Sequence, residues 1–302
     1  MPFALRRITS AIERDGPDDP ERSLELTRQH EVIAAPRKGS IDWRSFSAAD
    51  YDAADLDRAA AAWRTRAIQE FHSLALFTQL SSNLHLLGAP LDWCGAFARM
   101  IGDEVRHTDL CLRMADHLAP SGSATTAPMI AEETLHLSSD QPLATHVRDV
   151  VIAAFCIGET LSARMFKRVL RAATVPLARE VVSAILVDET FHGELGWELG
   201  ALLMRAIDPA ERDALAGRLP HLFTHYARLC DATRGPSWAR AEPEADPAPN
   251  FATLTSAGYA RAFFDGMAAD VVPGLVAIGL PEAQRAFDQL LSSEARVSAA
   301  AP

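Results

Sequence analysis

Apolar residues recur at the three-to-four-residue spacing of amphipathic helices along most of the chain beyond residue 52. This pattern predicts long helices over residues 53–87, from about 91 to 118, over 143–171 and over 177–206. The first and third connections contain the turn-forming sequences GAPLD and ATVP, whereas the second is long and rich in Pro, Ser and Thr. We therefore predict an all-α fold, a ferritin-like four-helix bundle with one long crossover.

Extra helical segments are expected on both sides of this bundle. We predict an N-terminal extension over residues 1–52, the bundle over residues 53–206, and a C-terminal helical extension over residues 207–302. Within the C-terminal extension, residues 235–250 are acidic and Pro-rich, which predicts a linker between helical segments.

The composition is that of an ordinary soluble protein with a sizeable core. Of 302 residues, 48% are hydrophobic and 23% charged. The net charge of −11 argues against nucleic acid or an anionic membrane as a main partner, since both attract basic surfaces. The four cysteines show no CxxC spacing, and no apolar run approaches the about 20 residues of a membrane span. We therefore expect free thiols and a cytoplasmic protein.

Two segments of predicted core helix carry an unusual cluster of charged residues. IGDEVRH, residues 101–107, and LVDETFH, residues 186–192, each place an Asp-Glu pair and a His in an apolar stretch. Burying ionised carboxylates costs several kcal/mol per group unless a counter-charge is present. A bound cation would supply that charge.

Each motif has a second glutamate upstream, so the two halves of the predicted bundle repeat one pattern. Glu70 precedes Glu104 by 34 residues, and Glu159 precedes Glu189 by 30. Glu159 and Glu189 each lie 13 residues from the turn between their helices, so an antiparallel hairpin brings them to the same height. The first hairpin is less symmetric, and a longer turn at HLLGAP would absorb the difference.

The donor types in this repeat favour a pair of metal ions. Within each motif the Glu and the His are three residues apart and share one helix face. Two divalent cations would neutralise the four carboxylates, and oxygen and imidazole donors without thiolate favour iron or manganese. We assign no catalytic residue beyond these ligands. The predicted metal ligands are Glu70, Glu104, His107, Glu159, Glu189 and His192.

Residues 55–206 resemble the ferritin-like di-iron carboxylate superfamily, in which two helices supply one Glu each and two supply Glu-x-x-His. The resemblance implies two Fe ions per chain, with a Mn/Fe pair as an alternative. It also implies that Glu104 and Glu189 bridge the metals, while the upstream Glu and the motif His of each half bind one metal terminally.

The Asp before each motif glutamate resembles the oxygenase side of the superfamily. That side includes bacterial multicomponent monooxygenases, ribonucleotide reductase small subunits and arylamine N-oxygenases. In these relatives the Asp of one motif supports the His of the other. The resemblance would therefore pair Asp103 with His192, and Asp188 with His107.

Several positions depart from individual relatives. Arylamine N-oxygenases typically carry a further His where this chain has Ile185, which weakens the resemblance to that branch. Arg106 resembles an Arg that orients an Asp in oxygenases, but Phe191 takes its place in the second motif. Ribonucleotide reductase small subunits commonly carry a radical Tyr where this chain has Cys111. Because the three tyrosines of the chain lie outside the predicted core helices, we expect no stable tyrosyl radical.

Two other histidine patterns are weaker. EETLH repeats the Glu-x-x-His spacing at Glu133 and His136, but it lies in the long connection without a preceding Asp. We do not assign it as a site. HLFTH places His221 and His225 four residues apart, which could bind a metal or form a solvated helix face. We favour the solvated face.

Residues within one turn of the ligands are candidates for lining a substrate pocket. Several are small, and a cavity or close helix packing explains their size equally well. Arg66 could hold a substrate carboxylate or extend to water at the helix edge, and we favour the second. The candidate lining residues are Arg66, Ser73, Cys111, Cys156, Ser162, Ile185 and Gly193.

Two classes of function fit these features. The first is an oxidoreductase that uses O2 to oxidise a small organic substrate by hydroxylation, N-oxygenation or desaturation, for example in biosynthesis. It would need an external reductase or electron donor, because the chain shows no flavin or iron–sulfur motif. The second is iron handling or peroxide detoxification. The chain has none of the rubredoxin-like Cys pairs of rubrerythrins, which argues against this second class. We favour the first class of function. The oligomer that we consider is a homodimer.

Overall fold

The computed structural model describes residues 30–119 and 141–299. These residues form helices and no strand, which confirms the all-α prediction. The chain divides into two compact units. Unit 1 comprises Met1–Asp140 and Pro176–Ile185, and unit 2 comprises Gln141–Val175 and Leu186–Pro302. Within the described ranges, no helix is both long and apolar enough to cross a membrane.

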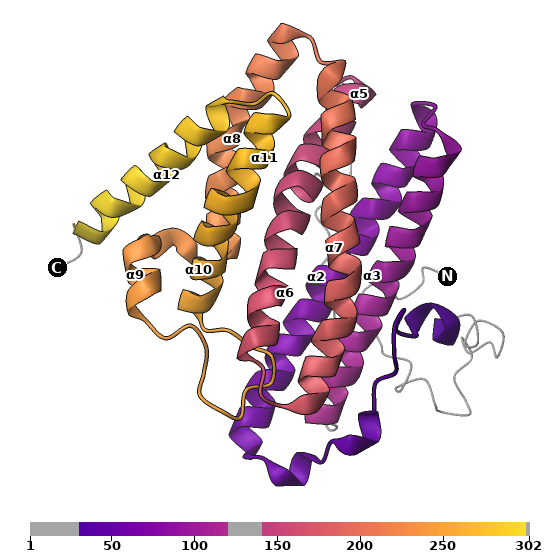
Figure 1. Cartoon of the computed structure of the whole chain (residues 1–302), viewed down its shortest axis with the longest axis vertical. Coiled ribbons are helices and arrows are strands. Elements are labelled where there is room, and N and C mark those ends of the chain that lie inside the picture. Colours follow the sequence, from indigo (N-terminus) through magenta and orange to yellow (C-terminus); the bar gives the residue numbers. More distant parts are fainter. Residues whose placement is uncertain (1–29, 120–140, 300–302) are drawn as a thin grey trace, which may run out of the picture. The chain divides into compact units, whose positions relative to one another are not determined.

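Unit 1 is built around a hairpin of two long helices, α2 (Ala53–Leu86) and α3 (Leu91–Leu118), which lie side by side (Figure 1). Asp52 starts α2, because its carboxylate accepts a hydrogen bond of 2.9 Å from the backbone N–H of Ala54. Gly88 ends the helix with a φ of 74°, a left-handed conformation that glycine adopts without strain. The short 3₁₀ helices η2 (Trp43–Ser45) and η3 (Ala48–Asp50) precede the hairpin. Its fully buried side chains include Trp63, Phe77, Leu80, Phe97, Met100 and Met114.

Unit 2 begins with one continuous helix that changes type along its length. The α-helix α5 (Leu143–Val150) leads into the π-helix η4 (Val151–Glu159), which leads into α6 (Thr160–Ala172). The sequence predicts this helix but not its π-helical middle. After α7 (Pro176–Arg205), whose residues from 186 onward belong to unit 2, further helices follow. They are α8 (Pro209–Leu229), η5 (Ala232–Arg234), α9 (Gly235–Ala241), α10 (Ser256–Gly266), η6 (Met267–Val271), α11 (Val272–Ala277) and α12 (Glu282–Ala299).

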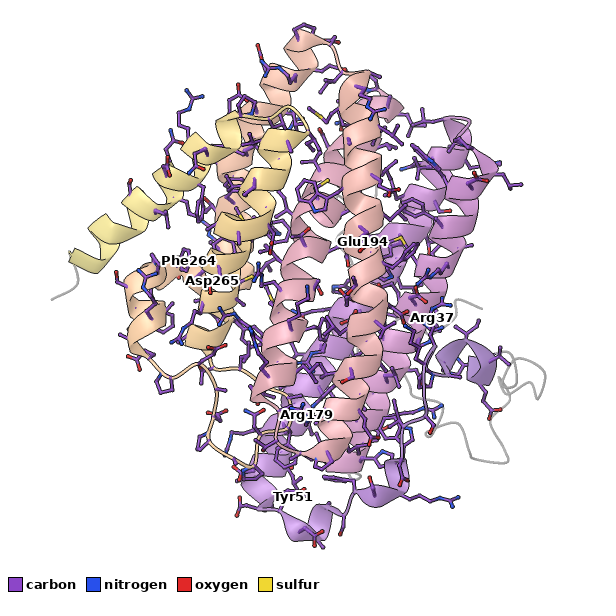
Figure 2. The ribbon with its side chains drawn as sticks, viewed as in Figure 1. Arg37, Tyr51, Arg179, Glu194, Phe264 and Asp265 are labelled. Carbon is purple, nitrogen blue, oxygen red and sulfur yellow. The ribbon has the colours of Figure 1, made fainter. Side chains whose placement is uncertain are left out.

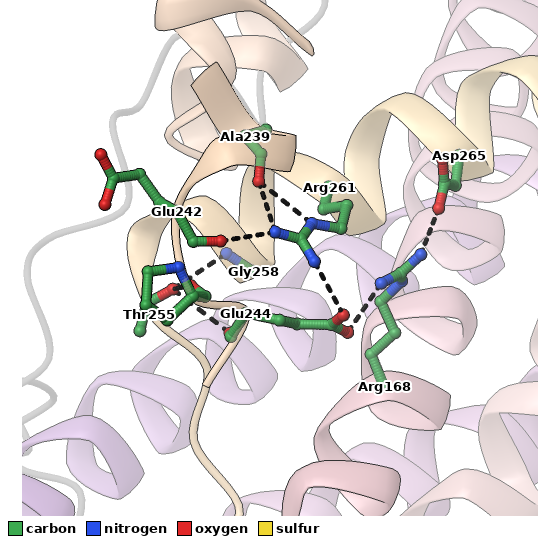
Figure 3. A network of polar contacts seen from close by, with 9 residues as sticks. Arg168, Ala239, Glu242, Glu244, Thr255, Gly258, Arg261 and Asp265 are labelled. Atoms are coloured by element: carbon green, nitrogen blue, oxygen red, sulfur yellow. Dashed lines mark hydrogen bonds and ion pairs between the residues drawn. The ribbon is translucent and has the colours of Figure 1, made fainter. Parts of the chain in front are cut away.

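The structure differs from the prediction of a linker over residues 235–250. The first part of this segment is helix α9, and the rest is anchored to its neighbours (Figure 3). Glu244 accepts hydrogen bonds from Arg168 of α6 at 2.6 Å and from Arg261 of α10 at 3.4 Å. A Cβ on Gly258 would lie 2.0 Å from the Glu244 carbonyl oxygen, so the backbones touch there. Glu244, one of the acidic residues of the predicted linker, is therefore a partner of two arginines.

Candidate metal centre

In unit 1, the predicted ligands from α2 and α3 meet in the interior of the hairpin. The His107 Nδ1 atom lies 3.5 Å from a Glu70 carboxylate oxygen and 3.8 Å from a Glu104 oxygen. One ligand atom from each of the three residues lies within 4.8 Å of the others. Glu70 is 7% exposed, Glu104 1% and His107 0%. Unit 1 thus contains a buried triad of two carboxylates and one imidazole that could hold a metal ion.

In unit 2, the second half of the repeat forms the same arrangement. Glu159 ends the π-helix η4, and Glu189 and His192 lie on α7. The His192 Nδ1 atom lies 3.5 Å from a Glu159 oxygen, and the three ligand atoms lie within 4.8 Å of one another. All three side chains are buried. The equal height that the sequence predicts for Glu159 and Glu189 is what brings them together.

The two triads fit a metal ion by charge and by donor type. Each has two carboxylates, whose charge one divalent cation would neutralise, and leaving them buried without a cation would cost several kcal/mol. In each, Nδ1 is the imidazole atom that faces the carboxylates, so it is the nitrogen available to a metal. The Nε2 atom is then left for a supporting partner outside the triad. Oxygen and nitrogen donors without thiolate suit iron or manganese.

No protein-family model, no curated protein and no solved structure matches this chain.

Asp103, one residue before Glu104, is fully buried among arginines of unit 1. Its Oδ1 atom accepts hydrogen bonds from Arg106 at 2.7 Å and from Arg37 Nε at 2.9 Å. Arg99 Nε lies 3.5 Å from Oδ2. The contact expected of Arg106 is therefore present. Arg37 comes from the segment before α2 (Figure 2), and no spacing in the sequence indicates it, because 66 residues separate it from Asp103.

Asp188, the equivalent residue in unit 2, is also fully buried. Burial of both aspartates agrees with supporting roles next to the triads, since an exposed carboxylate would have water as its partner. The pairings predicted for them, Asp103 with His192 and Asp188 with His107, stay predictions.

Arg66 and Cys111 lie close to the unit 1 triad. Arg66 is only 8% exposed, and its guanidinium carbon lies 4.3 Å from the centre of the Trp63 ring. The interpretation that Arg66 extends to water is therefore wrong, because stacking on an aromatic face replaces hydration. Burial, assisted by the charge of Glu70, raises the pKa of the Cys111 thiol, which is therefore a neutral neighbour of the triad.

The small residues of unit 2 divide between close packing and open space. A Cβ on Gly196 would lie 2.8 Å from Phe155 Cβ, and the Cys156 thiol donates to the Gly196 carbonyl at 3.4 Å. These residues therefore allow α7 to approach η4. A Cβ on Gly193 would meet no atom within 4 Å, so close packing does not explain that glycine. Among the other candidates, Ile185 is fully buried, whereas Ser73 and Ser162 are partly exposed.

The weaker histidine patterns gain no support. Glu133 and His136 lie outside the described residues. His221 and His225 are both exposed on α8, which confirms the solvated face that the sequence favours. The residue after them is different: Tyr226 donates a hydrogen bond of 2.8 Å to the Ala153 carbonyl of η4. The sequence does not indicate this contact, because Tyr226 lies beyond the predicted bundle and 73 residues from Ala153.

Proposed function

We propose that this protein is a non-haem di-iron oxidoreductase that uses O2 to oxidise a small organic substrate. In this proposal the two triads form one dimetal centre inside a ferritin-like four-helix bundle, with Glu104 and Glu189 as bridges. The observation that carries the proposal is the duplication of one buried donor set. Both copies have two glutamates, one histidine and the same 3.5 Å contact between Nδ1 and the upstream glutamate.

The charge of the donor set supports iron chemistry. Four carboxylates and two neutral imidazoles balance two divalent ions and stabilise the higher charge that follows oxidation. When bound, the iron pair would supply the electrons and the open coordination positions for reduction of O2. A redox reaction of this kind needs a further electron donor for each cycle, because the chain itself shows no flavin or iron–sulfur motif.

The surroundings of the triads also suit oxidation of an organic molecule. The six ligand residues are at most 8% exposed, which keeps bulk water away from reactive oxygen chemistry. The arginines around Asp103 fix the residue beside Glu104 and so hold the ligand helix in register.

Anaerobic loading with ferrous iron, followed by O2, tests the proposal. We expect two irons per chain and, by Mössbauer spectroscopy, oxidation to a ferric pair that stops until a reductant is added. His107→Ala and His192→Ala should each lower iron occupancy. The double variant His221→Ala/His225→Ala is the matched control, since these exposed histidines should not affect loading.

The rival function, iron handling, predicts a different outcome. Continued turnover with excess ferrous iron, growth of a mineral core and no oxidised product from a broad panel of small molecules would exclude the oxygenase proposal. A wild-type chain that binds no iron would exclude both.

A further inference from the structure

The ligand Glu159 is presented by an unusual stretch of helix. The π-helix η4 covers nine residues, Val151–Glu159, whereas π-helices occur mostly as single-turn bulges inside α-helices. Their wider backbone leaves weaker contacts within the helix itself. A stretch of this length therefore needs support from outside the helix, and Glu159 stands at its last position.

Two elements of unit 2 supply that support. From α7, Gly196 makes room for the η4 backbone, since a Cβ there would lie 3.1 Å from the Phe155 carbonyl carbon, and Gly200 makes room for the Cys156 side chain, whose sulfur would lie 2.6 Å from a Cβ. From α8, the Tyr226 hydroxyl donates to the Ala153 carbonyl at 2.8 Å. The same hydroxyl occupies space beside Gly158, where a Cβ would lie 2.8 Å from the oxygen. Tyr226 thus contacts η4 near its start and again one residue before Glu159.

The hydroxyl of Tyr226 remains a hydrogen-bond donor. Burial is the main cause that raises the pKa of Tyr226, and the negative charge of Glu159 raises it further. Loss of the phenolic proton is therefore disfavoured.

We infer that Tyr226 is a positioning residue, which holds the π-helical segment so that Glu159 faces His192. This inference rests on the proposed function for its metal, but the contact itself does not require one. Tyr226→Phe should let η4 relax toward α-helical geometry, because the Ala153 carbonyl loses a donor while the ring still fills its space. Glu159 would then move relative to the other two members of its triad.

Cobalt(II) is a suitable probe of this effect, because it binds without redox chemistry. In the His107→Ala background, only the unit 2 triad is complete, and Tyr226→Phe should weaken cobalt binding about tenfold. In the His192→Ala background, only the unit 1 triad is complete, and Tyr226→Phe should change nothing. Tyr259→Phe, which removes a hydroxyl from α10 of the same unit, is the matched control. Equal effects of Tyr226→Phe in both backgrounds, or no effect in either, would overturn the inference.

Gly158→Ala approaches the same contact from the other side. Its methyl group would displace the Tyr226 hydroxyl, so it should weaken the unit 2 site at least as much as Tyr226→Phe. In the double variant the methyl group would meet the ring carbon Cζ at 3.6 Å, an ordinary contact. We therefore expect the double variant to be no worse than Tyr226→Phe alone, since the two changes act on one contact. Additive losses would contradict a role of the hydroxyl.

Amide hydrogen exchange in the metal-free protein separates this inference from the proposed function. Tyr226→Phe and Gly158→Ala should speed exchange about tenfold in peptides that cover η4, whereas Tyr259→Phe should not. Unchanged exchange in both η4 variants would overturn the inference whatever the metal result. Absence of metal binding by the wild type would instead overturn the proposed function.

Discussion

The two triads contain the same donors and the same 3.5 Å contact between a histidine Nδ1 atom and the upstream glutamate, but their surroundings differ. Beside the unit 1 triad, Arg37, Arg99 and Arg106 surround a buried aspartate. In unit 2, the helix that carries Glu159 is π-helical, glycines of α7 pack closely against it, and Tyr226 of α8 donates a hydrogen bond to it. A repeated ligand pattern therefore does not imply a repeated support. Unit 1 should respond most to removal of charge, and unit 2 to changes of volume.

The largest expected effect concerns the residues that would make the two halves act as one centre. If Glu104 and Glu189 both bridge, Glu104→Ala or Glu189→Ala should reduce metal occupancy of both triads and not of one alone. The loss of metal affinity should exceed the roughly 10–100-fold loss that is typical when a supporting residue is removed. Metal analysis of each single variant and of the double variant measures this. A fully loaded double variant would refute the assignment, and loss of one metal only would show two independent sites.

The second prediction contrasts the two aspartates. Asp103→Ala leaves Arg106, only 5% exposed, without its counter-charge, which should cost about 3–5 kcal/mol of unfolding free energy. Arg37 and Arg99 are about one-third exposed and should contribute less, because water can solvate them. Because of these arginine contacts, Asp103→Ala should affect stability as well as metal binding.

Asp188→Ala should act mainly on the metal, with about 10–100-fold weaker binding. Denaturant unfolding and metal titration separate the two effects. Asp57→Ala, at an exposed position of α2, is the control and should change stability by no more than about 0.5 kcal/mol. If Asp103→Ala were as stable as the Asp57→Ala control, the arginine cluster would not support unit 1.

A third prediction tests the steric character of unit 2 with two glycines of α7. Gly196→Ala should destabilise the protein by about 1–3 kcal/mol, because the new Cβ would lie 2.8 Å from Phe155 Cβ and 3.1 Å from its backbone carbon. Gly193→Ala has free space and should stabilise the helix by up to about 1 kcal/mol. Thermal unfolding of the two variants compares them directly. Equal costs at both positions would mean that the approach of α7 to η4 is not tight.

The sequence predicts the long helices and the triads because both depend on local or periodic signals. The first helix is predicted over residues 53–87 and observed over Ala53–Leu86, since Asp52 and Gly88 mark its ends. The glutamates meet because a helix rises by a constant amount per residue on both sides of a tight turn.

The remaining features depend on signals that a periodic pattern does not contain. The run from Val151 to Ile157 is almost entirely apolar, so it shows no face whose spacing could distinguish a π-helix from an α-helix. Arg37 and Tyr226 reach the ligand helices from distant parts of the sequence. The anchored segment 235–250 has the composition of a linker, but Glu244 within it pairs with two arginines that only the fold brings near.

The smallest expected effect concerns tyrosine oxidation, where the two halves again differ. The residue four positions after the motif histidine is Cys111 in unit 1 and Gly196 in unit 2, so neither motif has a tyrosine there. Tyr226 lies outside the predicted core helices, but that is not a sufficient reason to exclude a radical, because the charge of Glu159 reaches its hydroxyl.

The stronger reason is the partner of that hydroxyl. Loss of the phenolic hydrogen is easiest when the hydroxyl donates to a base that takes the proton. The Tyr226 hydroxyl donates instead to the Ala153 backbone carbonyl, which accepts a hydrogen bond but does not hold a proton. Burial also disfavours the charged phenolate. We therefore expect no persistent tyrosyl signal in electron paramagnetic resonance after O2 is added to the iron-loaded protein, and no difference between wild type and Tyr226→Phe. A persistent signal that disappears in Tyr226→Phe would show that Tyr226 exchanges electrons with the centre and does more than hold Glu159 in place.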